Sequence, residues 1–167
     1  TFARRIALLG TLNSLSQLAL KATIPGVADF YQGTELWDFS LVDPDNRRPV
    51  DFSARSKLVE QPIDWTNLCQ TWTDGRCKLA LMRRLLSLRN EFPELFLVGS
   101  YEFLEVSGED TDRVVAFARR QGADQIVVAV GRKFGAATES GRRWPQSWRG
   151  QIEYEARGFT DKIGTID

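Results

Sequence analysis

The spacing of apolar residues changes at Gly99, and this change constrains the fold more than any other feature of the sequence. Before it, residues 2–22 and 75–91 repeat leucine and other apolar residues at intervals of three and four, as one face of an α-helix does. Pro25 ends the first helix, because the residue before a proline avoids helical dihedral angles. Residues 27–32, mostly apolar or aromatic, then predict a short strand. A helix, a tight turn and a short buried strand are typical of an α/β protein.

Capping residues mark the ends of the predicted helices. Asp74 is the predicted N-cap of the helix over 75–91, and Pro93 is the residue that ends it. A shorter helix is predicted over 53–60, with Ser53 as its N-cap.

After Gly99 the sequence contains short β-prone runs separated by turn residues at roughly ten-residue spacing, which indicates an antiparallel sandwich or barrel. These runs are residues 101–106, 113–120 and 125–133. Their charged side chains are expected to face solvent; they are Glu102, Glu105, Arg113 and Arg119. We place a domain boundary near 97–99, with one domain over 1–98 and a second, β-rich domain over 99–167.

Composition excludes several classes of function. The chain has no histidine, which rules out a Ser-His-Asp triad, a Cys-His pair and a histidine metal site, and we expect no metal and no cofactor. The formal net charge is zero, so we expect no nucleic acid partner and no membrane partner. Cys69 and Cys77 are expected to be plain thiols of a cytoplasmic protein. The apolar runs are too short and broken for a transmembrane helix.

Residues 27–52 hold six carboxylates, two adjacent arginines and five aromatic rings. Paired carboxylates can catalyse glycosyl transfer, but aspartates in a loop more often form turns with the nearby backbone. The aspartates in question are Asp38, Asp43, Asp45 and Asp51. Turn formation is the simpler interpretation, since spacing along a loop does not fix spacing between carboxylates.

The same segment also has the composition of a sugar-binding site, in which flat rings lie beside planar hydrogen-bonding groups. That set is Tyr31, Trp37, Phe39, Asp45, Asn46, Arg47 and Arg48. The alternative is that Trp37 and Phe39 pack in the core while the arginines form surface ion pairs. Glu35 either belongs to an active site at the carboxyl end of a barrel strand, or is a buried acid that fixes the loop through backbone N–H groups.

The stretch "PGVADFYQGTE" resembles the strand-eight segment of the α-amylase superfamily (glycoside hydrolase family 13), whose usual form is G-x-P-x-x-Y-Y-G-x-E. It departs from that form at Ala28, where proline is common, and at Gln32, which replaces the second tyrosine. The longer stretch "NSLSQLALKATIPGVADFYQGTELWDFSLVDPDNRRPVDF" is similar to the members of the superfamily that form trehalosyl linkages. The similarity extends over about residues 1–130 and fades after Gly135.

This resemblance implies an α+β fragment: the last helix and strand of a (β/α)₈ barrel plus connecting helices, followed by an antiparallel, sandwich-like C-terminal β-domain. Because such a barrel needs about 250 residues, the missing N-terminal barrel portion is an expected partner. Helix 2–22 would then pack on helix 75–91, or dimerise, or be disordered. The superfamily's catalytic carboxylates lie on earlier strands and match no residue here, so no catalytic residue is assigned.

The activity implied by the resemblance is a retaining intramolecular transfer in trehalose biosynthesis. It would convert the reducing-end α-1,4 linkage of a maltooligosaccharide into an α,α-1,1 linkage, and the isolated fragment would be inactive. The implied substrate-binding residues are Tyr31, Gln32, Glu35, Trp37, Asp45, Asn46, Arg47 and Arg48. The alternatives are a stand-alone carbohydrate-binding module, the tail of another hydrolase or transferase of the superfamily, and a purely structural β-domain.

Overall fold

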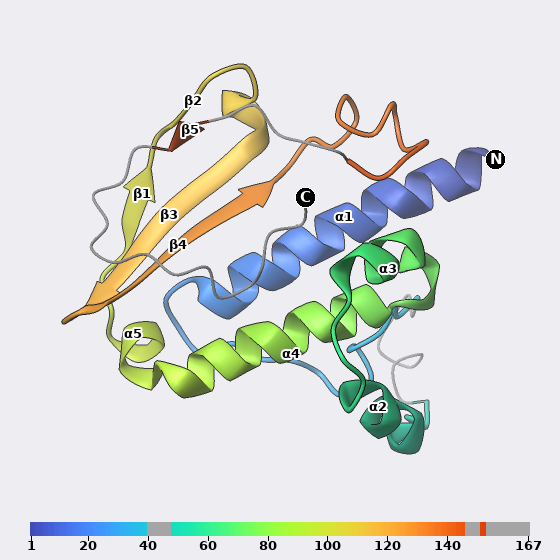
Figure 1. Ribbon diagram of the computed structural model, residues 1–167, viewed down its shortest axis with the longest axis horizontal. Coiled ribbons are helices and arrows are strands. Elements are labelled where there is room, and N and C mark those ends of the chain that lie inside the picture. Colours follow the sequence, from blue (N-terminus) through green and yellow to red (C-terminus); the bar gives the residue numbers. More distant parts are fainter. Residues whose placement is uncertain (40–47, 146–150, 153–167) are drawn as a thin grey trace.

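The computed structural model describes residues 1–39, 48–145 and 151–152 (Figure 1). Its helices are α1 (Phe2–Thr23), α2 (Phe52–Val59), α3 (Trp65–Gln70), α4 (Arg76–Glu91) and α5 (Pro93–Leu97). Its strands are β1 (Glu102–Leu104), β2 (Val106–Ser107), β3 (Val114–Gln121), β4 (Asp124–Gly131) and β5 (Gln151–Ile152). Short 3₁₀ turns cover Trp72–Asp74 (η2) and Thr111–Arg113 (η3). The helices precede the strands, so the described chain is a mixed α+β fold in which the change from helix to strand falls between Leu97 and Glu102.

Helix α1 is the central element: α4 lies along one side of it and the sheet along the other (Figure 1). Near the start of α1, Leu8 and Leu12 form an apolar cluster with Trp72 and Cys77. Near its end, a second cluster joins the two helices; its buried members are Leu18, Ala22, Met82 and Leu85. The first of the three expected arrangements, packing of helix 2–22 on helix 75–91, is therefore confirmed.

The cap predicted for the short helix at Ser53 is wrong. Helix α2 begins one residue earlier, at Phe52, and its N-cap is Asp51, whose Oδ1 accepts a hydrogen bond from the Ala54 N–H at 2.9 Å. Both Asp and Ser are good N-caps, so the local signal could not choose between them.

Helix α4 confirms the predicted element and modifies its cap. The residue at the N-cap position is Gly75, in the left-handed region with φ of 82°. Asp74 still caps this end, because its Oδ1 accepts from the Arg76 N–H at 2.9 Å. Pro93 lies beyond α4 and is the first residue of α5. An N–H at this position would have no acceptor within the helix, so proline costs no hydrogen bond there.

The strand predicted over 27–32 does not form. Residues 27–31 have no regular secondary structure, and a turn follows over 32–35, closed by a hydrogen bond from the Thr34 N–H to the Tyr31 carbonyl at 3.2 Å. A strand needs a neighbour to satisfy its backbone groups. Among the described residues the strands pair only with one another, so residues 27–31 have no such neighbour.

The β-prone runs do form strands, and all the described pairs are antiparallel as predicted. The main sheet has the order β1-β3-β4, with Phe117 of β3 opposite Phe103 on one side and Val128 on the other. A second pairing joins β2 to β5, with Val106 opposite Ile152. One face of the main sheet covers α1, where Phe117 and Val128 pack near Leu20. The Ser16 hydroxyl adds a hydrogen bond to the Gly131 carbonyl at 2.8 Å.

Arg119 corrects the expectation that charged residues of the strands face solvent. Its side chain is completely buried, whereas Glu102 and Glu105 are exposed as expected and Arg113 is half-buried. Alternation along β3 puts Arg119 on the same face as Phe117, toward the ends of α1 and α5. There the guanidinium finds backbone carbonyl acceptors, which is the condition for burying a charge.

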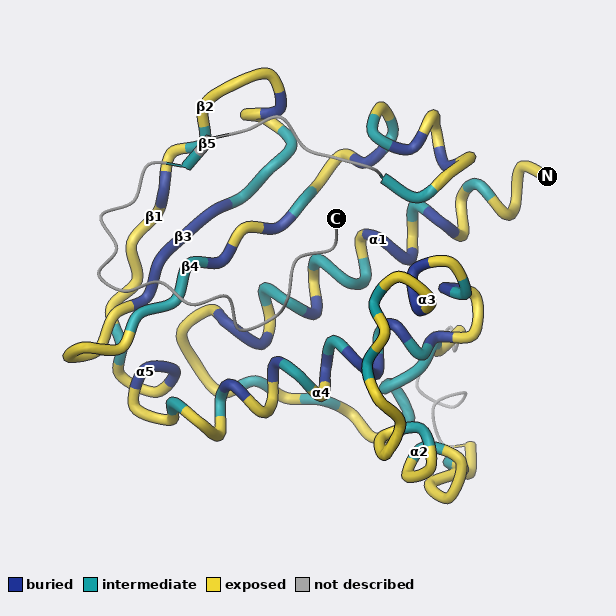
Figure 2. The backbone as a smooth tube through the Cα atoms, viewed as in Figure 1, coloured by how far each residue is buried: buried dark blue, intermediate teal, exposed yellow. Residues whose placement is uncertain are grey.

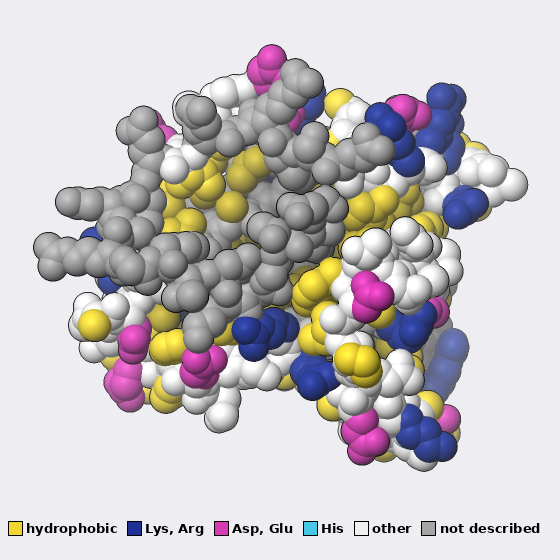
Figure 3. All heavy atoms as spheres, in the orientation of Figure 1, with side chains coloured by type: hydrophobic (Ala, Val, Ile, Leu, Met, Phe, Trp, Pro, Cys, Tyr) yellow, Lys and Arg dark blue, Asp and Glu magenta, His cyan; other side chains and the backbone are white. Residues whose placement is uncertain are grey.

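Burial differs between the main sheet and the short helix α2. Figure 2 shows the middle of β3 buried, while α2 has no buried residue. On the face seen in Figure 3, acidic and basic side chains are interspersed, as the balanced composition predicts. No helix in the described ranges has both the length and the hydropathy needed to cross a membrane.

Candidate substrate-binding site

The segment from Tyr31 to Trp37, here called the anchored turn, contains four of the predicted substrate-binding residues. Its backbone folds back on itself, since the Thr34 hydroxyl also donates to the Tyr31 carbonyl at 2.6 Å. Gly33 has φ of 89°, a region in which a side chain would be strained. A Cβ at this position would also lie 2.9 Å from Cγ2 of Val50, so the turn meets the chain that returns from the far end of the loop.

Glu35 is held inside this turn. Its Oε1 accepts from the Gly33 N–H at 3.2 Å, and its Oε2 accepts from Nε of Arg55 at 2.7 Å. Burial alone would raise the pKa of Glu35, but hydrogen bonds from its own backbone N–H, from Arg55 and from Gly33 lower that pKa overall. These contacts are the ones expected of an acid that fixes the loop through backbone groups.

Arg55 was not singled out from the sequence, yet its side chain makes three hydrogen bonds to residues on both sides of the undescribed residues 40–47. Besides Glu35, it donates from Nη2 to the Gly33 carbonyl at 2.9 Å and from Nη1 to the Asp51 carbonyl at 3.1 Å. Gly33 precedes and Asp51 follows residues 36–47, which we call the polar loop. The Asp51 contact is local, within the first turn of α2, whereas the contacts to Gly33 and Glu35 cross to the other side of the loop. Nothing in the local pattern of α2 distinguishes Arg55 from its basic neighbour Lys57, so only the three-dimensional arrangement identifies it.

Trp37 is fixed by a second set of contacts. Its indole Nε1 donates to the Trp72 carbonyl at 2.7 Å, and the ring packs against the apolar cluster at the start of α1. Lys78 of α4 lies with Nζ 5.7 Å from the Trp37 ring centroid and donates to the Leu36 carbonyl at 3.2 Å. Burial lowers the pKa of Lys78, although the nearby carboxylates of Asp38 and Glu35 oppose this. The core-packing alternative therefore describes Trp37, which is only partly accessible.

The remaining predicted residues divide into exposed and undescribed ones. Tyr31 is 48% exposed, and Gln32 and Arg48 are also exposed. Phe39 is 85% exposed and does not pack in the core. The predictions for Asp45, Asn46 and Arg47, and for the candidate acid Asp43, lie outside the described residues.

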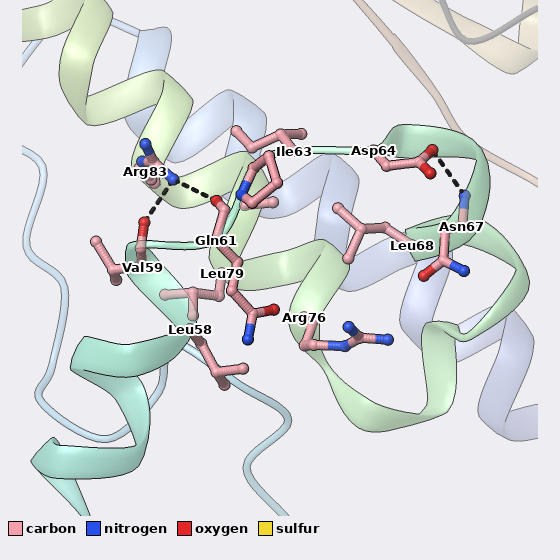
Figure 4. A pocket seen from close by; sticks show the side chains of 12 residues that line it. Leu58, Val59, Gln61, Ile63, Asp64, Asn67, Leu68, Arg76, Leu79 and Arg83 are labelled. Atoms are coloured by element: carbon pink, nitrogen blue, oxygen red, sulfur yellow. Dashed lines mark hydrogen bonds between the residues drawn. The ribbon is translucent and has the colours of Figure 1, made fainter.

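A separate pocket lies between α2, α3 and α4 (Figure 4). None of the predicted residues lines it. Two of its charged side chains have partners within the protein: Nη1 of Arg83 donates to the Val59 and Gln61 carbonyls at 2.5 and 3.1 Å, and Asp64 accepts from the Asn67 N–H at 3.1 Å. Asp64 is the single carboxylate among the residues that line this pocket, so the pocket offers no carboxylate pair for glycosyl transfer.

Metal and thiol chemistry find no support in the described part of the chain. No three His, Cys, Asp or Glu side chains of residues 1–39, 48–145 and 151–152 come together in a way that could hold a metal ion. Cys69 and Cys77 are free and buried, which confirms that they are plain thiols. Burial raises the pKa of Cys69, and burial together with the neighbouring Cys69 raises the pKa of Cys77 to about 12. Neither is a reactive thiolate at neutral pH.

No protein-family model matches the chain. The similar proteins and solved structures given below are all maltooligosyl trehalose synthases. A maltooligosyl trehalose synthase assigned in Mycobacterium tuberculosis, in strain H37Rv and in strain CDC 1551, is 42% identical over 123 residues, which is 72% of this chain. The crystal structure of a maltooligosyl trehalose synthase matches 74% of the chain with 30% identity and a TM-score of 0.58. The enzyme from Arthrobacter ramosus matches 86% with 32% identity and a TM-score of 0.60, and a point mutant of it matches 92% with a TM-score of 0.65.

By fold and sequence, the chain is thus related to a sugar-processing enzyme. It is homologous to a segment of maltooligosyl trehalose synthase, which confirms the resemblance drawn from the residues around the anchored turn. The chain spans 14% of the length of the curated relatives and between 18% and 21% of the solved chains.

Proposed function

We propose that the chain provides the substrate-binding loop and the β-domain of an enzyme that makes trehalosyl ends on maltooligosaccharides. The observation that carries this proposal is the 42% identity over 123 residues to the synthase segment. The other catalytic parts come from elsewhere in such an enzyme. Consistent with this, two described carboxylates of residues 27–52 have structural tasks: Glu35 is paired with Arg55, and Asp51 caps α2. The chain by itself is expected to be inactive.

The proposed reaction is a retaining intramolecular glucosyl transfer. A carboxylate nucleophile displaces the terminal reducing glucose by attacking the anomeric carbon of the adjoining sugar, and a carboxylic acid protonates the departing 4-oxygen. The released glucose stays in the site, turns, and attacks the covalent intermediate through its anomeric hydroxyl while returning a proton to the carboxylate. The α-1,4 bond becomes an α,α-1,1 bond with no net consumption of water. Water that enters instead releases free glucose.

In this reaction the loop of the present chain would line and brace the glucose site. Tyr31 would offer an accessible ring, and Gln32 and Arg48 would offer hydrogen bonds to sugar hydroxyls. Glu35 and Trp37 would hold the turn in shape through the contacts described above. The resemblance adds the remaining members of the set, Asp45, Asn46 and Arg47.

The fold supports a matching assignment of parts. Helix α1 would be the last helix of a (β/α)₈ barrel, and residues 27–32 would be the strand after it. Residues 1–98 would then form the end of the barrel, and residues 99–167 would form the β-domain. The support is that residues 27–31 have no regular secondary structure and no strand partner among the described residues, so residues 27–30 can pair with a strand of another sheet. A preceding barrel strand would provide that pairing.

A chimera tests the proposal directly. This chain replaces the matching segment of the Arthrobacter ramosus synthase, and the product is incubated with maltopentaose. We expect loss of reducing ends and formation of a trehalosyl product, whereas the chain alone changes nothing. A folded chimera that forms no trehalosyl product, beside an active parent enzyme, would contradict the proposal. If the chain alone then bound maltopentaose, with tryptophan fluorescence as the readout, it would be a carbohydrate-binding module instead.

A further inference from the structure

One side chain joins the two stems of the polar loop. The upstream stem is residues 31–35 and the downstream stem is residues 48–51, and between them they carry the exposed candidates for sugar contact. Arg55 donates from Nη2 to Gly33 and from Nε to Glu35 on the first stem, and from Nη1 to Asp51 on the second. These three hydrogen bonds are 2.9, 2.7 and 3.1 Å long.

The geometry of the guanidinium makes this arrangement specific. A planar fork with several fixed N–H directions can serve three acceptors at once, whereas an ammonium is a single point of charge. The ion pair with Glu35 is mostly shielded, with side-chain exposures of 19% for Arg55 and 24% for Glu35. The stems also touch directly at Gly33 and Val50, so their separation is set within narrow limits.

We propose that Arg55 is a positioning residue for the transfer reaction, and this inference rests on the proposed function. It fixes Tyr31 and Gln32 on one stem relative to Arg48 on the other. Its three donor atoms are engaged with protein acceptors, so it acts through these residues rather than on the sugar. With the stems in register, the released glucose stays oriented for attack by its anomeric hydroxyl. With the stems displaced, water intercepts the covalent intermediate.

The test compares products rather than rates, because the ratio of free glucose to trehalosyl product does not depend on how much enzyme is folded. In the active chimera, Arg55→Ala should raise this ratio about tenfold or more, with a fall in kcat for transfer, since misplacements of about 1 Å can reduce rates about 100-fold. Arg55→Lys should rescue only part of the loss. Lys57→Ala, an exposed change on the same helix, is the matched control and should leave the ratio unchanged.

Each outcome decides one question. A parent chimera without trehalosyl product means that the proposed function fails, and Arg55 is then not at issue. A productive chimera in which Arg55→Ala and Arg55→Lys keep the parental ratio overturns the positioning role. If Arg55→Ala does not fold, Glu35→Gln serves instead, because it removes the charge and keeps an acceptor oxygen. We expect a smaller rise in the ratio for Glu35→Gln. If the ratio rises in neither Glu35→Gln nor Arg55→Lys, the proposal is overturned.

Discussion

Replacing Arg119 by methionine should destabilise the protein strongly, although Arg119 lies on a strand whose pattern suggested an exposed charge. The side chain is fully buried. Its guanidinium donates to the Phe96 carbonyl at 2.9 Å and the Gly99 carbonyl at 2.8 Å, and more weakly to Thr23 and Ser100 at 3.4 and 3.3 Å. Burial lowers the pKa of Arg119, as does the nearby Arg89, yet an arginine stays charged in a folded protein.

The magnitude follows from the two short hydrogen bonds. A hydrogen bond to a charged group contributes about 1.5–3 kcal/mol, and a buried acceptor without a partner costs about 1–3 kcal/mol. Methionine fills similar space but leaves the Phe96 and Gly99 carbonyls without donors, while removing the desolvation cost of the buried charge. We therefore expect the free energy of unfolding to fall by about 3 kcal/mol for Arg119→Met. Arg119→Lys should lose at least as much, since one nitrogen cannot reach both acceptors.

Urea unfolding followed by circular dichroism measures this change. With a denaturant dependence of about 2 kcal/mol per molar urea, the midpoint should fall by about 1.5 M. The matched control is Arg120→Met, the next residue, whose side chain is 42% exposed and lies 3.9 Å from Glu102. Such a surface pair should change stability by no more than about 0.5 kcal/mol. If Arg119→Met and Arg120→Met shifted the midpoint equally, the argument from carbonyl satisfaction would be refuted.

The remaining predictions concern pH, thiols and glycines. Because the folded pKa of Glu35 is lowered, its stabilising effect is complete well above the ordinary value of 4.5 and is lost as the pH falls through the folded pKa. The stability difference between wild type and Glu35→Gln, from urea curves, should therefore shrink in acid. Iodoacetamide should label Cys69 and Cys77 only after denaturant is added, as read by mass spectrometry; labelling of the native protein would contradict their burial. Gly75→Ala should lower the melting temperature, because φ is 82° and the new Cβ would lie 2.9 Å from the backbone nitrogen of Trp37. Its control, Gly10→Ala, would have no atom within 4 Å of the new Cβ and should stabilise α1 by up to about 1 kcal/mol.

The elements that sequence reasoning placed correctly are those whose pattern repeats several times. Helices α1 and α4 and strands β3 and β4 are long enough for their periodicity to show which face is apolar. Such repeats do not identify single capping residues: the cap of α2 is Asp51 rather than Ser53, and both residue types are good N-caps.

The strand predicted over 27–32 was wrong for a related reason. Its composition suits a buried strand, but a strand forms only where a neighbour completes the hydrogen-bond ladder. The candidate site was likewise predictable only in part. Ring and polar composition identified Tyr31 and Trp37, whereas Arg55 and Lys78 lie on helices 20 and more residues away and carry no local signal. The sequence contains 22 basic and 22 acidic residues, so charge alone could not select the Arg55–Glu35 pair.

Several described helices end without the glycine that commonly terminates a helix, and arginines from other elements take over the task. At the end of α1, the Ala22 carbonyl accepts from Nη1 of Arg89 at 2.8 Å. At the end of α2, the Val59 carbonyl accepts from Nη1 of Arg83. Both arginines come from α4, so this helix contributes hydrogen bonds to its neighbours as well as apolar contacts.

Arg119 completes this scheme, since it donates to the Phe96 carbonyl in the last turn of α5 and to the Thr23 carbonyl in the last turn of α1. The last four carbonyls of a helix have no intrahelical partner, and a cation is further favoured there by the helix dipole. An arginine that provides both the donors and the charge can therefore be buried where no carboxylate is needed. Through these contacts strand β3 is held to the end of α1, from which the chain continues toward the anchored turn.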